Sequence, residues 1–256
     1  MNIYWLEQRE VDVPTDDRWL NTNELDRLGT MRVPKRRADW RLGRWTAKQA
    51  AISFLDRSAD SSNLAKIEIH ARPSGAPEVF LHDQLALVSI SLSHSSDTAL
   101  CTIAGFGRDF GCDLEKIEPR ADAFIADYFT PQEKVIIARS EIENRSLLVT
   151  LFWSAKESAL KTLRSGLRLS TTSVSVQLSE GDPCLGKKVH ETMHADATEW
   201  RPLSVRISAD RVFTGYWRVK GNLVRTVVSD VPQFTLHQFI ETSLATSLDP
   251  PSLSRL

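Results

Sequence analysis

Two short segments about forty residues apart constrain this chain more than any other part of its sequence. The first, residues 110–115, alternates apolar and polar side chains, as an extended strand does when successive side chains point to opposite faces. In such a strand Asp113 and Glu115 share one face, and Leu114 turns toward the core. This segment predicts a platform of two carboxylates, although an Asp-x-Glu pair by itself is more often a solvated strand face.

The second segment, residues 152–161, has the pattern of a helix. Residues four apart stack on one helical face, so Glu157 and Lys161 should project together, one turn beyond Trp153. Taken alone, this pair is typical of a surface ion pair. Together with the strand it supplies a third hard oxygen ligand, which suits Mg²⁺, an ion that keeps waters and completes its shell with phosphate oxygens. The two segments in this order therefore predict phosphate chemistry.

Composition sets the class of protein. The chain has 256 residues, of which 41% are hydrophobic, enough for one large domain or two ordinary ones. Its formal net charge is −1, so no global field favours nucleic acid or a membrane surface, and we expect neither as a partner. Three cysteines without zinc-type spacing favour a reducing compartment. No secretory signal pattern and no membrane-length apolar run are recognisable, so the expected location is the cytoplasm.

The first half of the chain is predicted to begin with helices and to continue as strands. Helices are expected over residues 15–30 and 35–55, and strands over 67–70, 79–81 and 87–92. The second helix carries a basic stripe, which by itself indicates a solvated face and consists of Arg37, Arg41, Arg44 and Lys48. The last strand ends in Ser93-His94-Ser95, whose donors could hold a phosphate, although a lone His there is usually an ordinary surface side chain.

The second half repeats this order after a junction at residues 105–107. Helices are expected over 120–144 and 147–163, the latter ended by Ser165-Gly166. Within the first stretch, Thr130 followed by Pro131 and Glu133 predicts a capped helix start. The strands that follow are expected over 174–178, 203–207 and 213–219. From residue 232 the chain looks like a short helical piece and then becomes rich in Ser and Pro. The pattern predicts an α+β protein of two halves and a poorly ordered tail.

In order and approximate spacing, the motifs resemble those of the 4′-phosphopantetheinyl transferases of the two-domain, surfactin-synthetase type. The resemblance covers roughly residues 1–225. It is carried by Ser-Leu-Ser-His-Ser at 91–95, Phe-Gly-Cys-Asp-Leu-Glu at 110–115 and Trp-Ser-Ala-Lys-Glu-Ser-Ala-Leu-Lys at 153–161, with weaker matches at Gly43-Arg44, Lys48, 75–77 and 129–133.

The resemblance implies an α+β fold of two similar halves related by pseudo-two-fold symmetry, with the active site in the cleft between them. Residues 1–106 would form the N-terminal half, 107–230 the C-terminal half and 231–256 a partly disordered tail. Single-half relatives build the same cleft between subunits, so the two-halved chain is expected to be a monomer.

The activity implied by the resemblance is that of a holo-[acyl-carrier-protein] synthase. Such an enzyme moves the phosphopantetheine arm of coenzyme A onto a serine of an acyl, peptidyl or aryl carrier protein domain and releases adenosine 3′,5′-bisphosphate. At the matching positions, Asp113, Glu115 and Glu157 would hold Mg²⁺, or Mn²⁺, against the diphosphate. Glu157 or a metal-bound water would accept the serine proton, and Lys161 and Lys156 would neutralise the leaving diphosphate.

The phosphates of coenzyme A require cations, which a near-neutral chain must supply locally. The resemblance assigns Ser93 and His94 to the adenosine 3′-phosphate and adds the basic positions Arg37, Arg44 and Lys48. Many relatives have Gly-Lys-Pro or Gly-Arg-Pro where this chain has Gly75-Ala76-Pro77. We expect Arg72, in the same turn, to replace the missing phosphate contact.

Two other functions stay open on the sequence alone. A coenzyme A-binding protein without turnover would keep the phosphate-binding residues, but it would have no need of all three carboxylates and Lys161. A metal-dependent phosphodiesterase would explain the carboxylates, but not the basic helix or the Ser-His-Ser segment.

Overall fold

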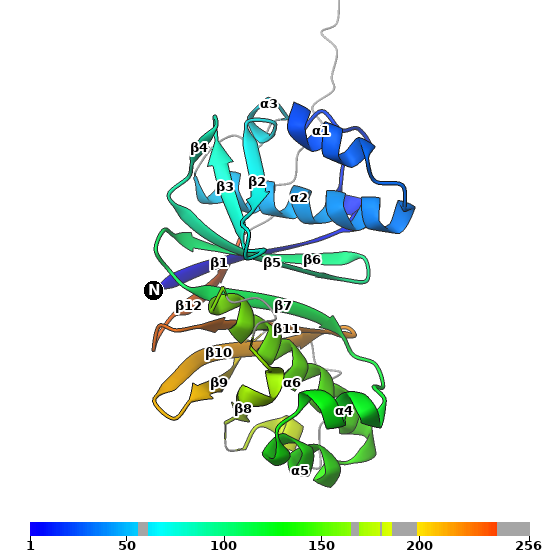
Figure 1. The fold of residues 1–256 in the computed structure, drawn as a ribbon, viewed down its shortest axis with the longest axis vertical. Helices are drawn as coiled ribbons and strands as arrows, with labels where there is room; N and C mark the ends of the chain where they lie inside the picture. Colours follow the sequence, from blue (N-terminus) through cyan, green and yellow to red (C-terminus); the bar gives the residue numbers. More distant parts are fainter. Residues whose placement is uncertain (56–60, 165–168, 180, 186–198, 240–256) are drawn as a thin grey trace, which may run out of the picture.

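The computed structural model describes residues 1–55, 61–164, 169–179, 181–185 and 199–239. Helices and sheets stack as a helix, a sheet, a second sheet and a second helix, in that order (Figure 1). The mixed α and β class is therefore confirmed, whereas the pseudo-two-fold relation between the halves stays a prediction.

The first sheet has the strand order β12-β1-β6-β5 and is covered on one face by the helix α2, Pro34–Phe54. The pairs β1–β6 and β6–β5 are antiparallel, and the pair β1–β12 is parallel. Ala47, Ala51 and Ile52 of α2 are fully buried in the core that this helix shares with the sheet. The strands are β1 Asn2–Arg9, β5 Val88–Ser95, β6 Thr98–Gly105 and β12 Thr235–Gln238.

The second sheet has the order β7-β11-β10-β9-β8 and is antiparallel wherever its strands pair. The helix α6, Ile142–Thr162, packs closely against it because Gly111 has no side chain: a Cβ there would lie 2.2 Å from the carbonyl oxygen of Ser158. The strands are β7 Phe110–Lys116, β8 Ser175–Leu178, β9 Arg201–Ser208, β10 Arg211–Lys220 and β11 Leu223–Ser229.

The inner faces of the two sheets meet in a core of their own. Trp5 and Leu100 from the first sheet, and Cys112 and Val227 from the second, belong to this buried cluster. Burying so much apolar surface between the sheets stabilises their relative position. The structure therefore holds the two edge strands β5 and β7 side by side, as described below for the candidate site.

The remaining elements are short and lie around this framework. A small sheet of order β2-β3-β4 carries the turn at residues 72–76 near one end of β5. These elements are α1 Thr22–Gly29, α3 Ser61–Leu64, β2 Ile67–Ala71, β3 Pro77–Leu81, β4 Gln84–Leu85, α4 Asp122–Tyr128, α5 Pro131–Arg139 and the 3-10 turns Glu10–Asp12, Thr171–Ser173 and Pro183–Leu185.

Several predicted boundaries differ from the observed ones for local reasons. The first helix begins only at Thr22, because Asn21 caps it in a reciprocal pair with Glu24. The single helical stretch expected over 120–144 is divided, because Thr130 starts α5 in the capping box that the sequence predicts. The predicted end of α6 at Ser165-Gly166 lies outside the described residues.

The structure after residue 231 differs from the prediction. It was expected to be helix-like and then a tail, but Thr235–Gln238 forms β12, in register with β1 from Asn2 to Trp5. The reason is tertiary, because β1 offers an unpaired edge and Phe234 is buried in the core between the sheets. Residues 240–256 lie outside the described part of the chain. Among the described residues, no helix combines the length and apolarity that crossing a membrane requires.

Candidate active site

A row of serines joins the edge strand of one sheet to the edge strand of the other. Alternate residues of β5 face β7, because side chains repeat every second residue along a strand. Ser91 Oγ accepts a hydrogen bond from the backbone N–H of Cys112 at 3.0 Å, and Ser95 Oγ accepts one from Lys116 at 3.2 Å. Ser93, between them, donates to a carboxylate oxygen of Asp113 at 2.8 Å. The Ser-x-Ser-x-Ser pattern thus places β5 against the carboxylate strand.

Asp113 is the centre of this site. Its side chain is almost fully buried, and Oδ1 accepts hydrogen bonds from Ser93 and from Lys161 Nζ, each at 2.8 Å. Lys161 also donates to the backbone oxygen of Cys112 at 3.0 Å. The other carboxylate oxygen, Oδ2, is buried without a hydrogen-bond partner. A buried, unsatisfied anionic oxygen is costly unless a ligand completes it.

Glu115 and Glu157 add negative charge near Asp113. Glu115 lies two residues further along β7, where it accepts a hydrogen bond from Trp153 Nε1 at 3.2 Å and faces Arg120 Nη2 at 3.5 Å. Glu157 comes from α6, one turn before Lys161. Burial, followed by the charge of Asp113, raises the pKa of Glu115 to about 7, and the same two causes raise the pKa of Glu157. The charge of Asp113 thus repels the charges of both glutamates.

These features fit a divalent cation. No group of three or more His, Cys, Asp or Glu side chains within the described ranges is already arranged as a metal site. A cation bound among the three side chains would nevertheless give Oδ2 of Asp113 a partner and would lower the raised pKa values of Glu115 and Glu157. All the donors are carboxylate oxygens, the set that Mg²⁺ and Mn²⁺ accept.

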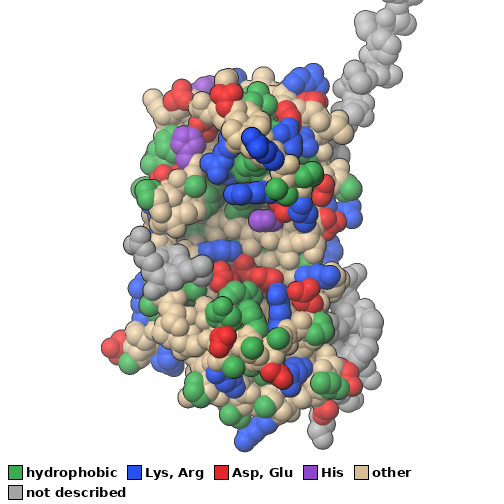
Figure 2. Space-filling model, turned by 45° about the vertical axis from the view of Figure 1, so that its right-hand side comes forward, with side chains coloured by type: hydrophobic (Ala, Val, Ile, Leu, Met, Phe, Trp, Pro, Cys, Tyr) green, Lys and Arg blue, Asp and Glu red, His purple; other side chains and the backbone are tan. Residues whose placement is uncertain are grey.

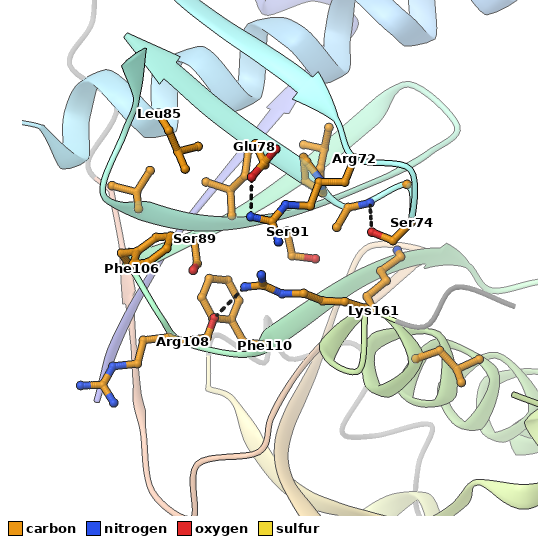
Figure 3. A pocket seen from close by; sticks show the side chains of 18 of the residues that line it. Arg72, Ser74, Glu78, Leu85, Ser89, Ser91, Phe106, Arg108, Phe110 and Lys161 are labelled. Atoms are coloured by element: carbon orange, nitrogen blue, oxygen red, sulfur yellow. Dashed lines mark hydrogen bonds and ion pairs between the residues drawn. The ribbon is translucent and has the colours of Figure 1, made fainter. Parts of the chain in front are cut away.

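A cavity of about 260 Å³ opens beside these carboxylates, and Figure 3 shows it from close by. The small sheet and β5 supply Arg72, residues 74–78, Leu85 and residues 88–92. The connection between β6 and β7, the strand β7, and α6 with the residues that follow it supply Phe106, Arg108, Phe110, Glu157, Leu160, Lys161 and Arg164. Four cationic and two acidic side chains line the space, together with apolar walls. Such a mixture suits an anionic ligand with an apolar ring or chain.

Figure 2 shows the outer face of this region, where acidic side chains gather in a hollow across the middle of the molecule and Lys and Arg side chains lie above them. Of the predicted residues, Asp113, Glu115, Glu157 and Lys161 come together. Ser93 joins them through Asp113. Arg72 lines the cavity and pairs with Glu78.

Lys156 does not reach this site. Its ammonium group is fully buried, lies 2.7 Å from a carboxylate oxygen of Glu133, and donates to the backbone oxygens of Tyr128 and Thr171. Burial lowers the pKa of Lys156, and Glu133 partly offsets that effect. The structure therefore corrects the expected contact of Lys156 with the leaving diphosphate, because the neighbouring positions 156 and 157 on a helix face different directions.

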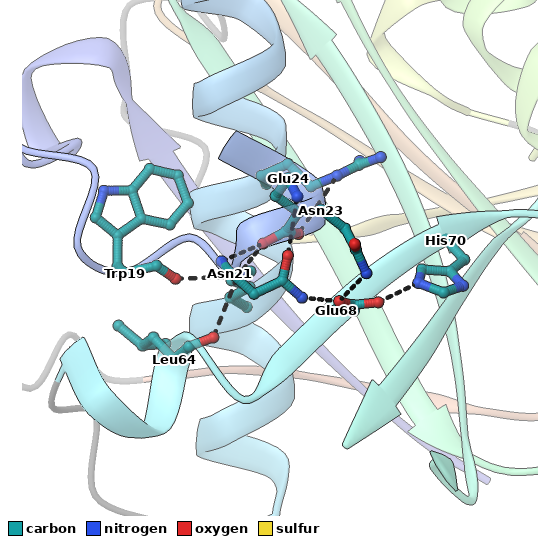
Figure 4. Close-up of polar contacts among 9 residues, drawn as sticks. Trp19, Asn21, Asn23, Glu24, Leu64, Glu68 and His70 are labelled. Carbon is teal, nitrogen blue, oxygen red and sulfur yellow. Dashed lines mark hydrogen bonds and ion pairs between the residues drawn. The ribbon is translucent and has the colours of Figure 1, made fainter. Parts of the chain in front are cut away.

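Lys48 is likewise turned inward, toward Trp19, Glu24 and Leu64, which Figure 4 labels. Its fully buried ammonium group pairs with Glu24 and donates to the backbone oxygens of Trp19 at 3.0 Å and Leu64 at 3.1 Å. This network joins α2 to α1 and α3. Lys48 is therefore not available as the phosphate ligand that the resemblance implied.

The other predicted phosphate ligands are also not among the residues that line the cavity. Arg44 is largely buried, 3.9 Å from Glu24 and stacked over Trp40, and burial lowers its pKa. Arg37 donates to the backbone oxygen of Leu28 and faces Asp17. His94 is exposed near the end of β5 and is not among the residues that line the cavity.

Ser91, Phe106, Arg108 and Arg164 were not among the predicted site residues. Serine occurs at every second position of residues 89–95, and this alternation was a signal that could have identified Ser91. Nothing in the local sequence indicated that residues 106–108 and 164 would border one cavity, because they come from the ends of elements far apart in the chain.

The raised pKa of Glu115 predicts how stability depends on pH in the metal-free protein. Because the folded state holds this proton up to about pH 7 and the unfolded state releases it near 4.5, stability is lost as the pH rises through that window. We expect the free energy of unfolding of the wild-type protein to fall by about 2 kcal/mol more than that of Glu115→Gln between these pH values. Urea unfolding at a series of pH values with a chelator measures this difference, and parallel profiles would contradict it.

Comparisons with known proteins agree with the motifs. Residues 109–216 match the family model of the 4′-phosphopantetheinyl transferase superfamily. The chain is 26% identical over 152 residues to the 4′-phosphopantetheinyl transferase HetI of Nostoc sp. (strain PCC 7120), and the match covers 58% of this chain and 61% of that protein. An apo-ACPS structure of Chronobacterium ammoiniagenes is 21% identical and covers 41% of this chain and 96% of its own, with a TM-score of 0.32.

The part of the chain that carries the carboxylates and Lys161 thus matches the model of the 4′-phosphopantetheinyl transferase superfamily. The family that the motifs predict is confirmed, and the two-domain type stays a prediction. The match spans about three fifths of the length of HetI.

Proposed function

We propose that this protein transfers the 4′-phosphopantetheine arm of coenzyme A to a serine hydroxyl of an acyl, peptidyl or aryl carrier protein domain. The observation that carries the proposal is the convergence of Ser93 and Lys161 on Asp113, beside two further carboxylates and a cation-lined cavity. The three carboxylates would hold a divalent cation, which would offset the negative charge of a diphosphate in the cavity. The site would lie between the N-terminal residues 1–106 and the C-terminal residues 107–230, and one chain would suffice as a monomer.

Asp113, Glu115 and Glu157 would hold Mg²⁺, and Mn²⁺ as a substitute. When bound, the ion supplies charge stabilisation for the diphosphate of coenzyme A. Ser93 and Lys161 fix Oδ1 of Asp113 and leave Oδ2 as the free ligand oxygen. The hydrogen bond from Trp153 orients Glu115 in the same way.

The reaction itself is a phosphoryl transfer between two oxygens. The carrier serine oxygen attacks the phosphorus that bears the pantetheine arm, and the bond from that phosphorus to the bridging oxygen breaks. Glu157, which projects from α6 one turn before Lys161, takes the proton of the serine hydroxyl. The bridging oxygen leaves with adenosine 3′,5′-bisphosphate, and the Lys161 ammonium group offsets its growing negative charge.

Arg72 would provide the phosphate contact that Ala76 does not. Its guanidinium lines the cavity and is oriented by Glu78 across the turn. We predict that Arg72→Ala weakens coenzyme A binding about tenfold, because a charge-assisted hydrogen bond is lost. Calorimetric titration of the variant checks this, and an unchanged dissociation constant would remove Arg72 from the site.

The direct test of the function is the intact mass of an apo carrier protein after incubation with this protein, coenzyme A and Mg²⁺. We expect a gain of about 340 Da, the mass of the arm, on the carrier serine. The gain should disappear with excess chelator and with a carrier whose serine is replaced by alanine. No gain across acyl, peptidyl and aryl carriers, despite measured coenzyme A binding, would instead favour a binding protein without turnover.

A metal-dependent phosphodiesterase would share the three carboxylates. It would hydrolyse coenzyme A or a simple diester in the absence of any carrier. The same incubation without carrier, analysed for adenosine 3′,5′-bisphosphate, separates the two activities.

A further inference from the structure

A buried ion pair joins the first sheet to the second. Glu7 extends from β1, and Arg225 extends from β11, where its side chain is 2% exposed. Arg225 Nη2 donates to Oε1 of Glu7 at 2.7 Å, and Nε donates to Oε2. Nη1 donates to the backbone oxygens of Lys220 at 3.1 Å and Leu223 at 2.8 Å. Every nitrogen of the guanidinium is therefore paired, and the carboxylate is held through both of its oxygens.

This pair is charged in an interface that is mostly apolar. The core between the sheets is built from side chains such as Trp5, Leu100 and Leu114. A buried ion pair is often no more stabilising than well-packed apolar side chains of similar volume, because both charges lose their hydration. Apolar surfaces, however, can meet in several registers, whereas paired N–H donors meet two carboxylate oxygens in one geometry. The ion pair therefore contributes orientation more than net stability.

The ion pair lies level with the carboxylate centre along the strands. In the first sheet, Ser93, Leu100 and Glu7 lie directly opposite one another on β5, β6 and β1. In the second sheet, Arg225 lies opposite the residue that follows Asp113 along β7. The contact of Ser93 with Asp113 at the sheet edge and the ion pair behind it thus connect the same parts of the two sheets. Two such contacts together resist both sliding and rotation of one sheet against the other.

We infer that the pair Glu7–Arg225 sets the register of β5 against β7 and thereby acts as a positioning device for Asp113. The structural part of this inference stands by itself, whereas its consequence for the reaction rests on the proposed function. A displacement of about 1 Å is enough to weaken a hydrogen bond and to misplace reacting groups. Oδ1 of Asp113 would then lose its donor Ser93, and the carboxylate would be less well oriented toward a cation.

Two backbone amides of β7, which we call the probe amides, report this register. The N–H of Cys112 donates to Ser91 Oγ at 3.0 Å, and the N–H of Lys116 donates to Ser95 Oγ at 3.2 Å. Both acceptors belong to the first sheet, so the probe amides resist hydrogen exchange while β5 stays in register. The amides of residues 214–217 serve as controls, because they lie on β10, which pairs on both sides within the second sheet.

The principal test replaces the ion pair by apolar side chains in Glu7→Leu/Arg225→Met. Because no buried charge is left without its partner, the thermal unfolding midpoint should stay within about 3 °C of wild type. We expect the probe amides to exchange at least about tenfold faster than in wild type, while the control amides keep their protection. Wild-type exchange at both probe amides would overturn the inference, since apolar packing alone would then set the register.

A milder variant and a matched control accompany this test. Arg225→Lys keeps the charge beside Glu7 without the paired donors, so its probe amides should exchange about threefold faster relative to the control amides. Full protection in Arg225→Lys would contradict the role of the paired contact. Lys156→Met/Glu133→Gln removes a buried ion pair that does not join the two sheets, and it should leave the ratio of probe to control exchange as in wild type.

Metal and carrier assays connect the register to the site. Titration of Glu7→Leu/Arg225→Met with Mn²⁺ should give a dissociation constant at least about threefold higher than that of wild type, because Ser93 no longer fixes Asp113. The kcat for carrier modification should fall as well. Faster exchange of the probe amides with unchanged Mn²⁺ affinity and unchanged transfer would overturn the positioning role. If wild-type protein modifies no carrier, the proposed function fails, and hydrogen exchange still decides whether the ion pair sets the register.

Discussion

Glu157→Gln is expected to lower kcat/KM for carrier modification by at least about 1,000-fold, because it removes both a carboxylate ligand and the proposed proton acceptor. The substitution keeps the shape of the side chain at its place on α6. It also removes a charge that burial and Asp113 disfavour, as the raised pKa of Glu157 indicates. The folded state should consequently be at least as stable as wild type at neutral pH and above. The measurement is the rate of mass gain of the carrier at several coenzyme A concentrations.

A matched control lies on the same helix. Glu143 is exposed in the first turn of α6, so Glu143→Gln changes the net charge equally but leaves the site intact. Its rate should equal that of wild type. Wild-type rates in Glu157→Gln would be incompatible with the proposed mechanism, and a lowered unfolding midpoint in that variant would contradict the electrostatic argument.

Lys156→Met is expected to destabilise the protein by about 3 kcal/mol, because it leaves Glu133 buried without its cation. Lys156 and Glu133 are 0% and 1% exposed at their side chains, and 2.7 Å separates Nζ from the carboxylate. Glu133 also accepts backbone hydrogen bonds from Thr130 at 2.8 Å and Val176 at 2.9 Å. The pair therefore joins α6 to α5 and β8. For a chain of this size, the unfolding midpoint should fall by roughly 10 °C.

The double variant Lys156→Met/Glu133→Gln tests this explanation. With both charges removed, much of the lost stability should return. Lys220→Met, at the exposed end of β10, is the control for loss of a lysine and should change little. Below its unfolding temperature, Lys156→Met should keep the wild-type KM for coenzyme A. A rise in the KM for coenzyme A without a change in stability would indicate instead that Lys156 binds the phosphates.

The central part of the site could be predicted from the sequence because its geometry is local. The period of two along β7 puts Asp113 and Glu115 on one face, and the i,i+4 spacing on α6 aligns Glu157 with Lys161. The capping box of Thr130 and Glu133 is equally local, since its two hydrogen bonds close within one turn. Backbone geometry fixes these relations whatever the rest of the chain does.

The cationic residues could not be assigned in this way. The basic stripe lies on the helix α2, as predicted, but its spacing does not indicate which residue each basic side chain contacts. Lys48 meets Glu24 and two carbonyl oxygens in a buried network, whereas an identical spacing on an exposed helix would have been solvated. The partner of a charge depends on packing against other elements, and no local spacing contains that information.

The sequence by itself determined the carboxylate strand, the helix that carries Glu157 and Lys161, and through their motifs the similarity to the 4′-phosphopantetheinyl transferase superfamily. Only the tertiary structure decided that the serines of β5 bond to β7, that β12 completes the first sheet, and that Arg72 and Arg164 border one cavity. The first set depends on backbone periodicity over a few residues. The second depends on burying apolar faces of segments far apart in the chain, which brings their edges and ends together only when the whole protein folds.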